Sequence, residues 1–184
     1  MRKLVYAINV TLDGFADHET VIADDELHDF HTGLLRSADA VLYGRGIYEL
    51  LASYWPTAPD NPASTPTEIE FANAVNRIPK IVFSKTLDKV EWSNSRLVKE
   101  NVVEEVMKLK KQPGKDLLVA GLSLASSLVD LGLVDEYWLL VQPILSGGGK
   151  PLFKNLHNRV HLKLIETKTL KSGVVVLHYQ AVSG

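Results

Sequence analysis

Residues 116–153 have the sequence DLLVAGLSLASSLVDLGLVDEYWLLVQPILSGGGKPLF, and this stretch decides the fold. It runs from an apolar strand through Gly121 into a short apolar helix, then into a second apolar strand and a glycine-rich loop. This order predicts a βαβ unit, in which the amides and the positive dipole end of the helix start can bind a phosphate. A second interpretation stays open, in which Gly121 only permits close packing and Ser123 is an ordinary N-cap.

Composition narrows the class of protein. The chain has 184 residues, no cysteine and a formal net charge of −2, so we expect one domain over residues 1–184 without disulfides or thiolate metal sites. The six histidines have no metal-ligand spacing, and we expect no metal. The near-neutral charge gives no bulk attraction to nucleic acid or an anionic membrane. Because the first apolar run is broken by Asn9 and Asp13, it is not a signal peptide, and we expect a cytoplasmic protein.

Strands and helices alternate along the rest of the chain, and the last two strands form a hairpin with a glycine turn. Thr67 with Glu70 and Asn101 with Glu104 have the spacing of capping boxes at two helix starts. The pattern therefore predicts an α/β fold of three αβα layers, with a mostly parallel central sheet and an antiparallel C-terminal hairpin. The expected strands are residues 3–12, 40–44, 80–84, 116–120, 134–145, 161–170 and 174–182, and the expected helices are residues 24–40, 46–55, 67–76, 102–111 and 122–130.

Three short segments follow the ends of predicted strands, and in a parallel sheet these ends share one edge. They are Gly44-Arg45, Ser84-Lys85 and the turn from Gly121 to Ser123. Two cations at this edge suit a phosphate, since a charge-assisted hydrogen bond contributes about 1.5 to 3 kcal/mol. The alternative is that Arg45 and Lys85 are solvated loop residues.

Three further residues are candidates for the substrate side. Asp13 ends the first strand and Asp29 lies on the helix that follows, so either carboxylate could orient a substrate or relay a proton. Asp13-Gly14 is equally a plain turn, and Asp29 equally a surface residue. Trp55 begins a segment with four prolines, residues 55–67, which we expect to form a lid or pocket wall. The Trp55 ring could stack on a planar heterocycle or anchor that segment.

Taken together, these motifs match a known family. The chain resembles the dihydrofolate reductase-like proteins related to the C-terminal reductase domain of bacterial riboflavin biosynthesis. The resemblance covers nearly the whole chain. The matching segments are NVTLDGF, ADAVLYGRGIYE, YWP, PKIVFSKTL, the stretch 116–153 and SGVVVLHYQ.

The resemblance implies a dihydrofolate reductase-like fold, NADPH as cofactor and hydride transfer to a small heterocycle related to a pteridine, pyrimidine or flavin. It implies that the cofactor contacts three segments: Gly44, Arg45 and Ile47; Ser84 and Lys85; and Gly121, Leu122, Ser123 and Leu124. Asp13, Asp29 and Trp55 would face the substrate, with the two carboxylates in catalytic roles. Similar proteins are often homodimers, and the strand at 134–145 is apolar on both faces, as a central or a dimer-interface strand would be.

Two positions depart from the family's pattern. Ile47 stands where a threonine often donates to a phosphate, and Leu122 stands where the turn usually has a second small residue. A leucine disfavours positive φ, and the loss of one neutral hydrogen bond costs about 1 kcal/mol, so weaker cofactor binding is expected. These departures motivate a rival hypothesis, a nucleotide-binding or dimerising module that keeps the fold without turnover.

Overall fold

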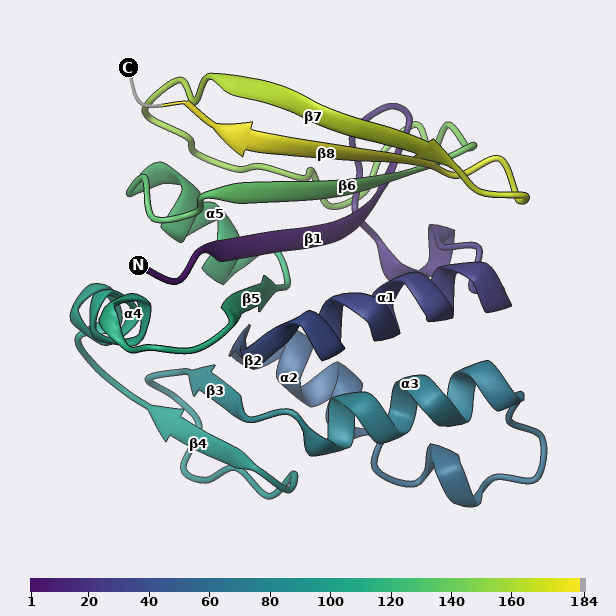
Figure 1. Cartoon of the computed structure of the whole chain (residues 1–184), viewed down its shortest axis with the longest axis horizontal. Coiled ribbons are helices and arrows are strands. Elements are labelled where there is room, and N and C mark those ends of the chain that lie inside the picture. Colours follow the sequence, from purple (N-terminus) through teal and green to yellow (C-terminus); the bar gives the residue numbers. More distant parts are fainter. Residues whose placement is uncertain (183–184) are drawn as a thin grey trace.

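The computed structural model describes residues 1–182, and within them eight strands form one sheet (Figure 1). The sheet order is β4-β3-β2-β5-β1-β6-β8-β7; the first six strands of that order pair in parallel, whereas β8 is antiparallel to both β6 and β7. This confirms the predicted mostly parallel sheet with an antiparallel C-terminal hairpin. The strands are β1 Leu4–Thr11, β2 Ala38–Gly44, β3 Lys80–Phe83, β4 Ser95–Val98, β5 Asp116–Ala120, β6 Glu136–Gln142, β7 Leu162–Thr169 and β8 Val175–Ala181.

Helices cover both faces of the sheet and complete the three layers. Leu35 of α1, Tyr48 of α2 and Val75 of α3 share one core with β2, whereas Val106 of α4 and Leu128 of α5 belong to the core on the other face. β3 is buried along its whole length, as expected for a parallel strand covered on both sides. The helices are α1 Asp25–Ser37, α2 Arg45–Ala52, α3 Pro66–Arg77, α4 Val102–Lys111 and α5 Ser123–Asp130, with short 3-10 turns η1 His18–Thr20 and η2 Ala58–Asp60.

The order in which strands are added to the sheet changes direction between β2 and β5. After β2 the chain goes by α2 and α3 on one face to β3, and after β5 it goes by α5 on the other face past β1 to β6. Because β2 and β5 are neighbours and their following helices go to opposite faces, the edge beyond their carboxyl ends is a switch point, the kind of place where ligands of open α/β sheets bind.

Two predicted helix starts were wrong in detail. Thr65 and Glu68, not Thr67 and Glu70, form the capping box of α3, because Pro66 occupies the first helical position that its fixed φ favours. Asn101 has a left-handed backbone, with φ of 56°, and its side chain makes no capping bond at α4. Side-chain capping needs an extended N-cap residue, so the predicted Asn101–Glu104 box does not form.

Two other features complete the comparison with the expected elements. β4, a short edge strand paired with β3, was not predicted because Ser95 and Arg96 give it little apolar pattern. β6 lies between β1 and β8, so its apolar character belongs to a central strand. Within residues 1–182, no helix is long and apolar enough to span a bilayer.

Candidate active site

At the switch point between β2 and β5 lie two glycines, each packed against the other strand's helix. A Cβ added to Gly44 would lie 3.5 Å from the Cβ of Leu124, and one added to Gly121 would lie 2.8 Å from Cγ2 of Ile47. The first turn of α5 therefore lies directly against the end of β2, and the first turn of α2 against the end of β5. These predicted segments do come together at one edge.

The first amides of α2 and α5 receive no side-chain cap from their N-cap residues. The N-caps of α2 and α5, Gly44 and Leu122, provide no side-chain capping bond. The positive φ of the turn, 90°, belongs to Gly121, whereas Leu122 has an ordinary right-handed φ of −93°. The strain expected from a leucine at position 122 therefore does not arise, because Gly121 alone makes the sharp bend. Ser123 is exposed beside it.

Arg45 connects the ends of β2 and β3. Its Nη1 donates to Oγ1 of Thr86 at 2.9 Å and its Nε to the Glu49 carboxylate at 3.1 Å. Ser84 Oγ accepts from the amides of Thr86 and Leu87, which fixes the turn after β3, and the neighbouring Lys85 is exposed. Because the Arg45–Glu49 pair is exposed, it contributes little stability, and the guanidinium can turn to an anion at small cost.

Asp13 holds two loops together at the carboxyl end of β1. Its carboxylate accepts the Thr11 hydroxyl at 2.6 Å and the amides of Ser146 and Gly147 at 3.1 and 2.7 Å. The hydroxyl and the two amides lower the pKa of Asp13 to about 2. Asp13 therefore holds the glycine-rich segment of residues 145–150 against the turn after β1. This structural role does not depend on a catalytic role.

Replacing Asp13 by asparagine should loosen residues 145–150, because a neutral amide is a weaker acceptor for the two backbone donors. In the wild type the folded pKa lies below the ordinary value of 3.8, so this contribution is complete above pH 3.8 and is lost as the pH falls towards 2. Hydrogen exchange should show faster exchange at Ser146 and Gly147 in the variant at neutral pH. Unchanged protection there, matching an Asp88→Asn control at another exposed carboxylate, would contradict this role.

The inner side of α1 has polar residues that the sequence analysis did not select. His28 and Thr32 are buried, one turn apart, and His31 lies against Asn9 of β1. Asp29, between them in sequence, is exposed. The sequence does contain a signal for these polar residues: positions 28, 31 and 32 share the helical face of Leu27 and Leu35, where polar residues are unusual.

Trp55 lies next to this inner side of α1. Its ring contacts Phe71 of α3 edge-on at 4.5 Å between centroids and His28 at 6.1 Å. Asn9, towards the carboxyl end of β1, is on a strand paired with β5, so the α1 side and the β2–β5 switch point share one sheet edge. Trp55 is therefore placed where a wall of a substrate pocket would be.

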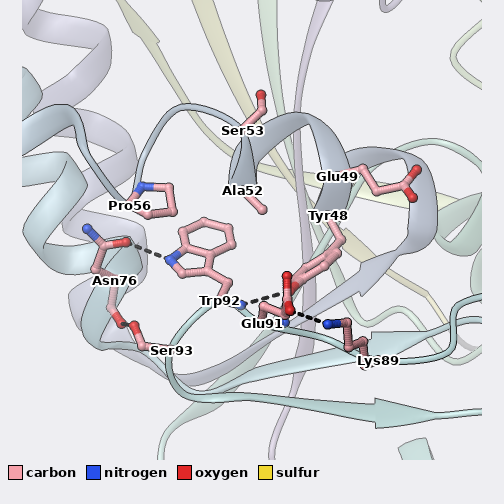
Figure 2. Close-up of a pocket in the computed structure, with 10 residues that line it drawn as sticks. All are labelled: Tyr48, Glu49, Ala52, Ser53, Pro56, Asn76, Lys89, Glu91, Trp92 and Ser93. Carbon is pink, nitrogen blue, oxygen red and sulfur yellow. Dashed lines mark hydrogen bonds and ion pairs between the residues drawn. The ribbon is translucent and has the colours of Figure 1, made fainter.

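A separate hollow of about 750 Å³ lies on the outer side of α2 (Figure 2). The Tyr48 hydroxyl there accepts the amides of Glu91 and Trp92, and Trp92 Nε1 donates to Asn76 at 2.6 Å. Glu91 is paired with Lys89. These polar groups are already engaged in holding the loop before β4, so the hollow does not form part of the candidate site.

Comparison with known proteins agrees with this geometry. Residues 2–176 match the model of the RibD C-terminal domain. The chain belongs to this family. This match confirms the resemblance that the motifs indicated. The fold is therefore reductase-like.

One relative and two solved structures show what this chain is similar to. The uncharacterized protein YyaP of Bacillus subtilis is 38% identical over 182 residues, 97% of this chain and 94% of that protein. A structure from Shewanella sp. PV-4, solved as a candidate riboflavin biosynthesis protein, has a TM-score of 0.75 at 20% identity and covers 98% of this chain and 99% of its own. Dihydrofolate reductase from Enterococcus faecalis, complexed with NADP(H), has a TM-score of 0.61 at 12% identity, covering 98% and 97%.

Proposed function

We propose that this chain is an NADPH-dependent reductase that transfers a hydride to a small heterocycle related to a pteridine, pyrimidine or flavin. The observation that carries the proposal is the switch point between β2 and β5, where two helix starts without side-chain caps meet and Arg45 begins α2. The enzyme from Enterococcus faecalis with NADP(H) has the same fold, which supports a nicotinamide cofactor.

The residues at the switch point have the chemistry to bind a dinucleotide. Gly121 makes the sharp turn into α5, with φ of 90°, and the amides after Leu122 would donate to a pyrophosphate, as would the Ser123 hydroxyl. Leu124 and Ile47 would provide apolar walls, with Gly44 at the floor. Arg45 and Lys85, beside Ser84, would bind a ribose 2′-phosphate. When bound, NADPH supplies the hydride; the protein contributes position and electrostatics.

On the substrate side, Trp55 would form the wall against which the heterocycle lies. Catalytic roles for Asp13 and Asp29 stay predictions, because Asp13 already binds residues 145–150 and Asp29 is exposed. Replacing each aspartate by asparagine tests these roles. The substitution should lower kcat if the carboxylate is catalytic, and should leave kcat nearly unchanged if the aspartate is only a loop contact or a surface residue.

The main test of the proposal is cofactor discrimination. Arg45→Ala and Lys85→Ala should each weaken NADPH binding about tenfold, the equivalent of about 1.4 kcal/mol, and change NADH binding much less. Titration by the fluorescence of the three tryptophans gives both affinities. Arg36→Ala is the matched control, since Arg36 forms an equally exposed ion pair with Glu70 near the opposite end of β2. Equal losses for NADPH and NADH would refute the assignment to the 2′-phosphate.

One feature favours a second candidate function, a nucleotide-binding or dimerising module without turnover. Ile47 places an apolar side chain at the first turn of α2, on Gly121, where a hydroxyl could have donated to a phosphate. The absence of saturable NADPH binding up to millimolar concentration would support this module and refute the reductase.

Cellular location and oligomeric state stay predictions, namely a cytoplasmic homodimer. β7 is a fully exposed strand at the sheet edge, with Leu162, Leu164 and Ile165 among its exposed residues. Such an edge can pair with a second copy. Light scattering after size-exclusion chromatography should give the mass of two chains, and the mass of one chain would contradict it.

A further inference from the structure

The hollow on the outer side of α2 has its charged side chains at one end (Figure 2). They are Glu49, Lys89 and Glu91, and all three are exposed. On the other side of the Trp92 ring lies Pro56, which is also exposed. The volume of the hollow, about 750 Å³, is within the range of pockets that bind small molecules. The hollow therefore offers accessible surface to a ligand with a charged end and an apolar body.

The apolar surface of the hollow lies beside its charged end. Ala52 and Pro56 are accessible there, next to the largely buried rings of Tyr48 and Trp92. The Trp92 ring already has the ammonium of Lys80 at 4.5 Å from its centre, and its Nε1 donates to Asn76. Trp92 therefore provides apolar contact and no second place for a cation. Recognition of a charged group has to come from the exposed end.

Both carboxylates at that end keep one oxygen without a partner. Oε1 of Glu49 accepts from Nε of Arg45 at 3.1 Å, and Oε1 of Glu91 is paired with Lys89. The Oε2 atoms of both glutamates have no hydrogen-bond or ion-pair partner among the described residues. Arg45 does not line the hollow, so the lining side chains bring two carboxylates and one ammonium. The charged end is therefore net negative.

The end of α2 adds to this negative potential. α2 has no basic residue in its last turn, whereas Arg36 and Arg77 lie in the last turns of α1 and α3. A helix C-terminus has a partial negative charge that favours a cation within about one turn. Ala52, the last residue of α2, lines the hollow. A cation bound in the hollow would therefore complement a helix end that the sequence leaves without a basic side chain.

We infer that this hollow is a separate ligand site, which binds a small organic cation with an ammonium group on a flat apolar body. The ammonium pairs with Glu49, and Glu91 adds attraction from the same end of the hollow. The apolar body lies against Ala52 and Pro56. Exposed ion pairs are weak, so a ligand can compete with Arg45 for the Glu49 carboxylate.

Glu49 also links the hollow to the β2–β5 switch point. Its partner Arg45 is the residue that binds the 2′-phosphate of NADPH in the proposed function, on which this link rests. When the guanidinium turns to the phosphate, Glu49 loses its partner and attracts a cation more strongly. Coupling between two sites is reciprocal, so a cation on Glu49 also releases Arg45 for the cofactor. The cation would therefore promote NADPH binding.

Three probes of similar size test the site on the full chain. They are 2-phenylethylammonium, the neutral 2-phenylethanol and the anionic 3-phenylpropanoate; the alkylammonium stays protonated at pH 7. Isothermal titration should show saturable binding of the ammonium probe, at least tenfold tighter than binding of the alcohol, and no binding of the anion. The ammonium probe should also shift the indole N–H resonance of Trp92, which is identified by its loss in Trp92→Phe. Equal affinities for the ammonium probe and the alcohol would overturn the inference.

Substitutions of exposed side chains test the role of Glu49 without disturbing the fold. Glu49→Gln should weaken the ammonium probe at least fivefold and leave the alcohol unchanged. Glu70→Gln is the matched control, because Glu70 is also an exposed helix carboxylate paired with an arginine but does not line the hollow. Arg45→Ala should tighten the ammonium probe about threefold, since it releases Glu49. Unchanged affinity in Glu49→Gln, or weaker binding in Arg45→Ala, would refute the role of Glu49.

Addition of NADPH separates this inference from the proposed function. Saturating NADPH should tighten the ammonium probe about threefold in the wild type and not in Arg45→Ala. Equal affinity with and without bound NADPH would refute the link through Arg45. If NADPH does not bind while the ammonium probe binds with dependence on Glu49, the reductase proposal fails and the cation site stands. If NADPH binds with dependence on Arg45 and the ammonium probe does not bind, the cation site fails and the reductase proposal stands.

Discussion

Replacing Gly121 by alanine is expected to lower the free energy of unfolding by about 2 to 4 kcal/mol and to weaken NADPH binding at least tenfold. Gly121 has φ of 90°, which an L side chain adopts only with strain, and the new Cβ would meet Ile47 at 2.8 Å from Cγ2 and 3.0 Å from Cβ. Ile47 is β-branched and stiff, so the α5 start must move. Denaturant unfolding and fluorescence titration measure the two effects.

Gly132 provides the matched control for the Gly121 prediction. It lies just after α5 and also has positive φ, 67°, but nothing stands within 4 Å of its added Cβ. Gly132→Ala should therefore cost only about 1 kcal/mol and leave NADPH affinity unchanged. The double variant Ile47→Ala with Gly121→Ala should recover the part of the loss caused by the clash. A cost at Gly121 no larger than at Gly132 would contradict the close packing on Ile47.

The fold could be predicted because its strands are apolar runs buried on both faces. β2, β3 and β5 have this character, and Gly44, Pro79 and Gly121 mark strand boundaries. Strand order could not be predicted in the same way, since no local pattern says that β5 inserts between β1 and β2. The order depends on which helices fit which face, a property of the packed core.

The candidate site could also be predicted only in part from the sequence. Gly44, Arg45 and Gly121 could be selected because each follows a strand end, and strand ends share an edge. The inner side of α1 was missed because one residue of helix corresponds to a rotation of about 100°, so a choice between His28 and Asp29 needs the helix's orientation on the sheet. Asp29 was predicted for the chemistry of its carboxylate; the structure leaves Asp29 exposed and buries the neighbouring His28.

Replacing Lys80 by alanine is expected to lower the free energy of unfolding by about 3 to 5 kcal/mol, because it removes three hydrogen bonds and leaves a cavity. Lys80 is 1% exposed, and its Nζ donates to the carbonyls of Asn76, Ile78 and Ser93 at 3.0 to 3.1 Å. The ammonium also lies 4.5 Å from the centre of the Trp92 ring. The Lys80 side chain therefore connects the end of α3 to the loop before β4.

The pH dependence of this loss tests the state of the Lys80 ammonium. Burial lowers the pKa of Lys80 from 10.5 to about 8, so between these values the unfolded chain binds a proton that the folded chain does not. Wild-type stability relative to Lys80→Ala should therefore rise as the pH increases from 8 towards 10.5. Denaturant unfolding at pH 7.5 and pH 9.5 measures the difference, with Lys89→Ala, at an exposed ion pair, as the control that should change stability by less than about 0.5 kcal/mol at both. A gap between wild type and Lys80→Ala that stays constant would mean that the three carbonyls and the Trp92 ring hold the proton on Lys80 throughout, with their attraction outweighing the cost of burial.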